Sequence, residues 1–178
     1  MPDVGKYLEG GGFADQVNER AATALAEVFN ESSERRVLLI SHGLGSIAAF
    51  HALHRLSGTH PAVKLNTWIT LGSPLADETV KRSLPTQDLT NLVNWFNIAA
   101  EDDFVCHDET VANDYEHMLQ DRHISRLEDY QIYNMAVRYG KVAPHNALGY
   151  LIHPRTTQLV AEWLETHGAA PDTLPAGR

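Results

Sequence analysis

The sequence predicts an α/β fold, a mainly parallel sheet flanked by helices. Apolar runs of strand length alternate along the chain with amphipathic segments of helical length, which is typical of this class. One of the runs, Arg-Val-Leu-Leu-Ile-Ser at 36–41, does not alternate polar with apolar residues. Strands with this pattern are covered on both faces in parallel sheets, and parallel strands need the crossovers that the helical segments supply.

Local patterns predict the elements in chain order. A helix over 13–34 carries apolar residues at three- and four-residue spacings: Phe13, Val17, Ala21, Leu25, Val28 and Phe29. There follow a strand over 36–41, a helix over 46–56 capped by Gly58, a strand over 63–75 ended by Pro74, a strand over 91–100, and a fourth strand around Tyr130 to Tyr133. The C-terminal helix starts at Pro154 and turns four side chains inward: Leu159, Val160, Trp163 and Leu164.

Length and composition fit one folded domain. The chain has 178 residues, of which 43% are hydrophobic and 21% charged, values near the globular average. A chain of this size buries roughly 70% of the surface that its unfolded form exposes, so it can build a core without disulfides or metals. We expect residues 1–168 to form a single domain and residues 169–178 to form a flexible tail.

Charge and cysteine content exclude several classes of partner. The net charge of −9, from 23 acidic and 14 basic residues, repels a polyphosphate backbone, so nucleic acid is not expected as a partner. Cys106 is the single cysteine, which excludes an intrachain disulfide. The N-terminus lacks the pattern of a secretion signal, and no run reaches the ~18 apolar residues of a membrane span. These features favour a cytoplasmic protein.

Ligands of parallel sheets bind beyond the carboxyl ends of the strands. This rule selects three loops, at 42–45, 72–75 and 101–108. The first follows an apolar strand and opens a helix; with the preceding Ser41 it reads Ser-His-Gly-Leu-Gly, with the small residues Ser41 and Gly45 around Gly43. That pattern is typical of a nucleophile elbow, a tight strand-to-helix turn that presents one reactive side chain, but Gly43 has none.

Four motifs together resemble the α/β-hydrolases, in particular their esterase and lipase-like branch. They are Ser-His-Gly-Leu-Gly-Ser at 41–46, Thr-Leu-Gly-Ser-Pro-Leu at 70–75, the acid loop in Asn-Trp-Phe-Asn-Ile-Ala-Ala-Glu-Asp-Asp-Phe-Val at 94–105, and the histidine loop His-Asn-Ala-Leu-Gly-Tyr-Leu at 145–151. Their chain order of elbow, acid and histidine is the order of the hydrolase triad. The resemblance spans about residues 36–151.

The resemblance implies a role for each matching residue. Asp103 would be the triad acid, His145 the base and Gly43 the nucleophile position, while Leu44 would offer its N–H to an oxyanion and Ser73 would lie at the binding edge. Without a hydroxyl at position 43, ester hydrolysis should be absent or slower by about 10⁴- to 10⁶-fold. The implied ligand is a carboxylic ester or acyl compound, with no metal or other cofactor.

The family pattern also implies strands and a Gly-rich oxyanion loop before the first long helix. Only about a dozen residues stand there, and Gly10 to Gly12 follow no predicted strand. We therefore expect a sheet without the N-terminal strands of the family. Either the chain is part of a longer protein, or it is a reduced domain that lacks one oxyanion donor. A lid between Cys106 and Gly140 is expected to cover the pocket.

Other reactive residues have simpler interpretations. Ser46 in a first helical turn is expected to be a cap, Ser73 part of a turn, Cys106 a small buried hydrophobe, and His42 a loop residue beneath the elbow. A group rich in acids and histidines matches no metal-binding signature, so we expect a solvated acidic loop; its members are Asp102, Asp103, His107, Asp108, Asp114, His117, Asp121 and His123.

Three functions remain open from the sequence. The first is an esterase-like hydrolase impaired at Gly43. The second is a non-catalytic binding or scaffolding protein that keeps the pocket for a small ligand or a protein partner. The third is hydrolysis by direct attack of water, with His145 as general base.

Overall fold

The computed structural model describes residues 2–31, 36–86, 88–106 and 108–167. Its main sheet consists of four parallel strands in the order β1 (Leu38–His42), β2 (Leu65–Leu71), β3 (Leu92–Ala100) and β4 (Arg126–Ile132). A separate antiparallel pair is formed by β5 (Val137–Arg138) and β6 (Lys141–Val142). The α/β fold with a parallel sheet is therefore confirmed.

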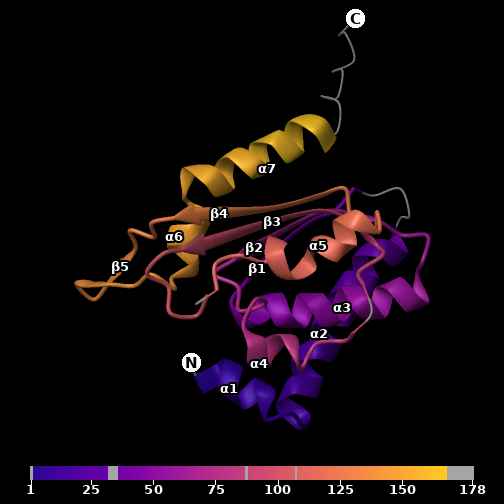
Figure 1. Ribbon diagram of the computed structural model, residues 1–178, viewed down its shortest axis with the longest axis horizontal. Coiled ribbons are helices and arrows are strands. Elements are labelled where there is room, and N and C mark those ends of the chain that lie inside the picture. Colours follow the sequence, from indigo (N-terminus) through magenta and orange to yellow (C-terminus); the bar gives the residue numbers. More distant parts are fainter. Residues whose placement is uncertain (1, 32–35, 87, 107, 168–178) are drawn as a thin grey trace, which may run out of the picture.

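Helices cover the sheet in layers (Figure 1). Figure 1 shows α7 (Pro154–His167) on one face and α2 (Gly12–Glu31) and α3 (Leu44–Thr59) on the other, with α1 (Pro2–Leu8) beyond them. Shorter helices complete the described part: α4 (Glu78–Lys81), α5 (Ala112–Gln120) and α6 (Ala147–Leu151).

The two faces of the sheet form two apolar clusters. Trp68 and Trp95 belong to the cluster on the side of α2 and α3, where their rings stack with centroids 4.7 Å apart. The next residues along the same strands, Ile69 and Phe96, belong to the other cluster together with Leu159 of α7. Because successive strand residues point to opposite faces, β2 and β3 need apolar residues on both faces.

Most predicted elements are present, but several details were wrong. β1 is an edge strand with Ile40 36% exposed, so it is not covered on both faces. Gly58 lies inside α3, which continues to Thr59 because the His60 N–H still donates to Leu56 O. Leu164 is 54% exposed rather than turned inward. The expected helical end at 32–34, Gly168 and the tail at 169–178 lie outside the described residues.

The segment between Cys106 and Gly140 is not a lid. It contains α5, which crosses over between β3 and β4, and β4 itself, which is longer and begins earlier than the sequence predicted. β4 is hard to recognise because it is an edge strand that includes Glu128 and Asp129. The Asp129 carboxylate accepts the N–H groups of Val111 and Ala112 at 2.9 Å each, which fixes the start of α5 against the sheet.

Candidate active site

The turn after β1 has the backbone geometry of an elbow. Gly43 follows the last residue of β1 and is the N-cap of α3, with φ 53° and ψ −127°, and its N–H donates to Leu71 O at 3.1 Å. A positive φ of this kind is strained for any residue with a side chain, so glycine is favoured here. Leu44 is the first residue of α3, where the N–H groups have no acceptor within the helix and the dipole favours negative charge.

Asp103 and His145 form a hydrogen-bonded pair at the carboxyl edge of the sheet. The distance from His145 Nδ1 to Asp103 Oδ2 is 2.8 Å. The Asp103 side chain is completely buried and that of His145 is 17% exposed. The pair spans 42 residues of sequence: Asp103 follows β3, and His145 lies between β6 and α6.

Two further donors hold the Asp103 carboxylate. The Tyr150 hydroxyl donates to Oδ2 at 2.7 Å, and the Val105 N–H donates to Oδ1 at 2.9 Å. Burial by itself raises the pKa of Asp103, but the hydrogen bonds from His145, Tyr150 and Val105 outweigh it and leave the pKa below its ordinary value. The carboxylate therefore stays ionised at neutral pH and can orient His145 through Nδ1.

The other nitrogen of His145 faces Gly43. A Cβ built on Gly43 would lie 2.9 Å from His145 Nε2 and 3.1 Å from Cε1. The structure thus brings together Gly43, Asp103 and His145, which the sequence analysis predicted as the elbow position, the acid and the base. The glycine leaves no atom for Nε2 to deprotonate, and the base stands so close that a side chain at position 43 would require His145 to move.

Asn134 holds the loop that carries His145, a role that the sequence analysis missed. This buried amide donates through Nδ2 to Pro144 O at 2.6 Å and to Asn146 O at 3.0 Å, so it binds the residues on both sides of His145. Its Oδ1 accepts the Ala136 N–H at 3.1 Å. No sequence signal distinguishes Asn134 from an ordinary loop asparagine.

Tyr150 was also missed as a site residue, although its ring belongs to the histidine-loop motif. Besides donating to Asp103, its hydroxyl accepts the Ala100 N–H at 3.0 Å, and the residue is fully buried. Burial is the main cause of a raised pKa, so the phenol stays protonated and remains a donor. Tyr150 therefore links the end of β3 to Asp103.

His42 is the last residue of β1 rather than the loop residue that the sequence predicted. Its ring lies against that of His145, with centroids 4.3 Å apart, and its Nε2 is buried without a hydrogen-bond partner in the described structure. Burial, with a smaller contribution from the charge of His145, lowers the pKa of His42 to about 4. A neutral imidazole therefore packs beside the candidate base.

Ser73 and Ser46 both bond to structural partners. The Ser73 hydroxyl accepts the Leu75 N–H at 3.3 Å, as expected for a turn, and within the described residues it bonds neither Asp103 nor His145. Ser46 does not cap α3, because Gly43 is the N-cap and no side chain bonds there. Instead the Ser46 hydroxyl pairs with Ser41 Oγ at 3.0 Å, and Ser41 accepts the Trp68 indole N–H.

Neither Cys106 nor the acid- and histidine-rich group offers an alternative site. Burial raises the pKa of the Cys106 thiol to about 12, so a thiolate nucleophile is not available at neutral pH. Among the described residues no group of three or more histidine, cysteine, aspartate or glutamate side chains could hold a metal. Of the eight sequence candidates, His107 lies outside the described residues.

Two hollows adjoin the candidate site. One, of about 260 Å³, is lined by Phe104, His145 and the hairpin residues Arg138 and Val142. The other, of about 320 Å³, lies between α1 and α4 and shares Phe104. Phe104 is 57% exposed, so an apolar side chain stands between the two hollows next to the candidate base.

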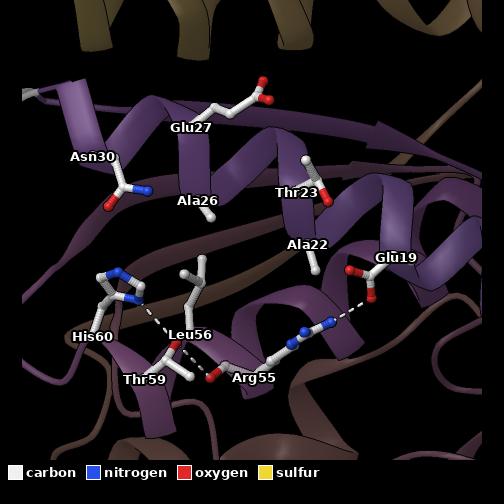
Figure 2. Close-up of a pocket in the computed structure, with 10 residues that line it drawn as sticks. All are labelled: Glu19, Ala22, Thr23, Ala26, Glu27, Asn30, Arg55, Leu56, Thr59 and His60. Carbon is white, nitrogen blue, oxygen red and sulfur yellow. Dashed lines mark hydrogen bonds and ion pairs between the residues drawn. The ribbon is translucent and has the colours of Figure 1, made fainter.

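A separate hollow of about 310 Å³ lies between α2 and α3 (Figure 2). The small side chains of Ala22 and Ala26 line this hollow, and Arg55 forms an ion pair with Glu19 at 2.6 Å across it. None of its lining residues comes from the three loops at the carboxyl edge of the sheet, and it contains no paired acid and base like Asp103 and His145.

Comparisons with known proteins support the fold. No protein-family model matches the chain, and no significant match was found among curated proteins. Among solved structures the chain is similar to a proposed cell surface hydrolase from Lactobacillus plantarum WCFS1, with a TM-score of 0.52 and 14% identity, covering 91% of this chain and 67% of that one. The chain is thus an α/β protein whose fold resembles that of a hydrolase.

None of the described helices has the length and hydropathy to cross a membrane.

Proposed function

We propose that this chain is an esterase-like protein of the α/β-hydrolase kind that binds carboxylic ester or acyl ligands and is catalytically impaired at Gly43. One observation carries the proposal: a buried Asp103 carboxylate orients His145 through Nδ1, while Nε2 faces the elbow at Gly43. In serine hydrolases this arrangement lets the histidine take the proton of the nucleophile. Leu44 N–H is the proposed oxyanion donor.

The deciding experiment restores the nucleophile. Gly43→Ser is treated with a fluorophosphonate probe, and covalent labelling is followed by intact-protein mass. We expect labelling of the variant and none of the wild-type protein. Because the serine Cβ would start 2.9 Å from Nε2, His145 must move before the hydroxyl can bond to it.

Controls separate chemistry from folding. Gly43→Ala introduces the same Cβ and the same backbone strain without a hydroxyl, and must stay unlabelled. Adding His145→Ala to Gly43→Ser should slow labelling by about 10⁴-fold or more. A Gly43→Ser protein that retains its far-ultraviolet circular dichroism and takes up no probe would refute the triad assignment.

The second candidate is a protein that binds such ligands without hydrolysing them. It is favoured by the approach of His145 to Gly43, since Nε2 occupies room that a side chain at position 43 would need. Thermal stabilisation of the wild-type protein by fatty acids or esters, without release of product, would support it. Slow ester hydrolysis that disappears in His145→Ala would argue against it and favour attack by water with His145 as base.

A further inference from the structure

Exposed apolar side chains are concentrated in one part of the molecule. Eight of the eleven large hydrophobic residues that are exposed in the described structure lie between 133 and 152, and Phe104 lies beside them at the small hollow next to His145. Five of the eight belong to the β5–β6 hairpin and the segment leading into it. We call these five the apolar ridge: Tyr133, Met135, Val137, Tyr139 and Val142.

The ridge projects from the body of the protein. Figure 1 shows the hairpin extending away from the carboxyl end of the main sheet. Val137 pairs with Val142 and Arg138 with Lys141, so Tyr139 and Gly140 form a two-residue turn at the tip. Met135 is 84% exposed and Tyr139 90% exposed, values that are high for apolar and aromatic side chains.

The tip has an unfavourable residue for its conformation. Tyr139 and Gly140 have φ angles of 52° and 73°, the signs required by the turn that joins tight hairpins, in which asparagine or aspartate before glycine is strongly preferred. A tyrosine at this position strains the backbone and leaves its ring in water. Backbone strain of this kind clusters at functional sites, which makes the tip a candidate for a role outside the fold.

The charge around the ridge is opposite to that of the rest of the chain. Although the protein has a net charge of −9, residues 133–161 contain no aspartate or glutamate and include Arg138, Lys141 and Arg155. Arg138 and Lys141 are both exposed and lie on the hairpin itself. Carboxylates act at the root of the ridge, where Glu101 bonds to the Tyr133 hydroxyl and the charges of Asp102 and Glu109 also act on it.

We propose that the apolar ridge docks the protein onto an anionic lipid surface. Aromatic and aliphatic side chains on a projecting hairpin can enter the boundary between headgroups and acyl chains, while Arg138 and Lys141 contact the anionic headgroups. A fluid lipid layer receives a projecting tip without a matching hollow, which a protein partner would have to provide. The proposal does not depend on the proposed function, because it concerns binding alone.

Docking would also place the candidate site at the lipid surface. The hollow that contains His145 is lined by Arg138 and Val142 of the hairpin. A hairpin inserted into the headgroup region would therefore bring an ester or acyl group of a lipid within reach of the same edge of the sheet.

The test is flotation of the wild-type protein with vesicles of phosphatidylcholine alone or of phosphatidylcholine mixed with phosphatidylglycerol. We expect binding to the mixed vesicles that weakens with added salt, and little binding to phosphatidylcholine alone. Replacing both Arg138 and Lys141 by glutamine should weaken binding by about fivefold per cation. Leu164→Ser, which changes an exposed leucine on α7, is the matched control and should bind as the wild type does.

Tyr139→Asn distinguishes docking from folding. Asn-Gly suits the tip turn better than Tyr-Gly, so this variant should keep or raise the melting temperature while weakening vesicle binding by about tenfold. Absence of binding to the mixed vesicles at low salt, or unchanged binding of Tyr139→Asn, would overturn the proposal. So would a concentration-dependent dimer in light scattering that Tyr139→Asn abolishes, because the ridge would then contact a second copy of the chain.

Discussion

Tyr150→Phe tests how much the hydrogen bonds of the Tyr150 hydroxyl contribute to the stability of the protein. The substitution removes only a hydroxyl from a fully buried ring, so packing is retained. It deprives Asp103 Oδ2 of a donor at 2.7 Å and leaves the Ala100 N–H, at 3.0 Å from that hydroxyl, without its acceptor. A hydrogen bond to a buried charge contributes about 1.5–3 kcal/mol, and a stranded buried N–H costs about 1–3 kcal/mol.

We therefore expect Tyr150→Phe to lower the free energy of unfolding by about 3 kcal/mol at neutral pH. The loss should depend on pH. The folded-state pKa of Asp103 is lowered, so its ionised form stabilises the fold above the unfolded pKa of about 3.9, and this stability is lost as the pH falls through the folded value. The difference between the wild type and the variant should narrow in acid.

Urea unfolding followed by tryptophan fluorescence, at neutral and acidic pH, measures both effects. Tyr130→Phe is the matched control, because that hydroxyl donates to Glu128 near the protein surface and its removal should cost less than about 0.5 kcal/mol. If the two variants lose the same stability, or if the loss at Tyr150 is the same at both pH values, the account of Asp103 as a buried, hydrogen-bonded carboxylate is wrong.

Two further predictions concern the loop and the second imidazole. Gly149→Ala would place a Cβ 1.8 Å from Asn134 Oδ1, so Asn134 should be displaced. We expect the free energy of unfolding measured in urea to fall by about 2–4 kcal/mol, and hydrogen exchange in the His145 loop to become faster. Gly58→Ala is the control: its Cβ would meet open space, so it should be neutral or stabilising. In a nuclear magnetic resonance titration His42 should protonate near pH 4. The pKa of His42 in the folded protein is below its unfolded value of about 6.5, so the fold has its full stability above pH 6.5 and loses some as the pH falls toward 4. His42→Asn should make this loss of stability smaller.

Strong periodic patterns made most of the fold predictable. The apolar runs at β2 and β3 and the amphipathic α2 and α7 contain enough signal for their type and approximate position to be assigned. Errors occurred where tertiary context overrides local preference. Gly58 stays helical because α3 continues to make hydrogen bonds past it, and β4 forms although its charged residues resemble those of a loop.

The candidate site was predictable only where a motif carries its geometry. Gly43 and Asp103 could be selected because they lie in loops at the carboxyl ends of predicted parallel strands, which meet at one edge of the sheet. His145 could be selected only because its motif resembles a histidine loop, and in the structure it lies against both of the other residues. Asn134 and Tyr150 could not be selected, since their roles depend on bonds to groups that are 10 to 50 residues away. The assignment of catalytic roles stays a prediction until Gly43→Ser is tested.

Residue type and local order were enough to establish the parallel α/β architecture, the absence of a hydroxyl at the elbow and the unequal distribution of charge along the chain. Three features could be seen only in the folded molecule: a Cβ at position 43 would lie 2.9 Å from His145 Nε2, Tyr150 holds Asp103, and the hairpin residues are left in water. Those features depend on distances between segments far apart in the chain, which packing of the sheet and its helices sets.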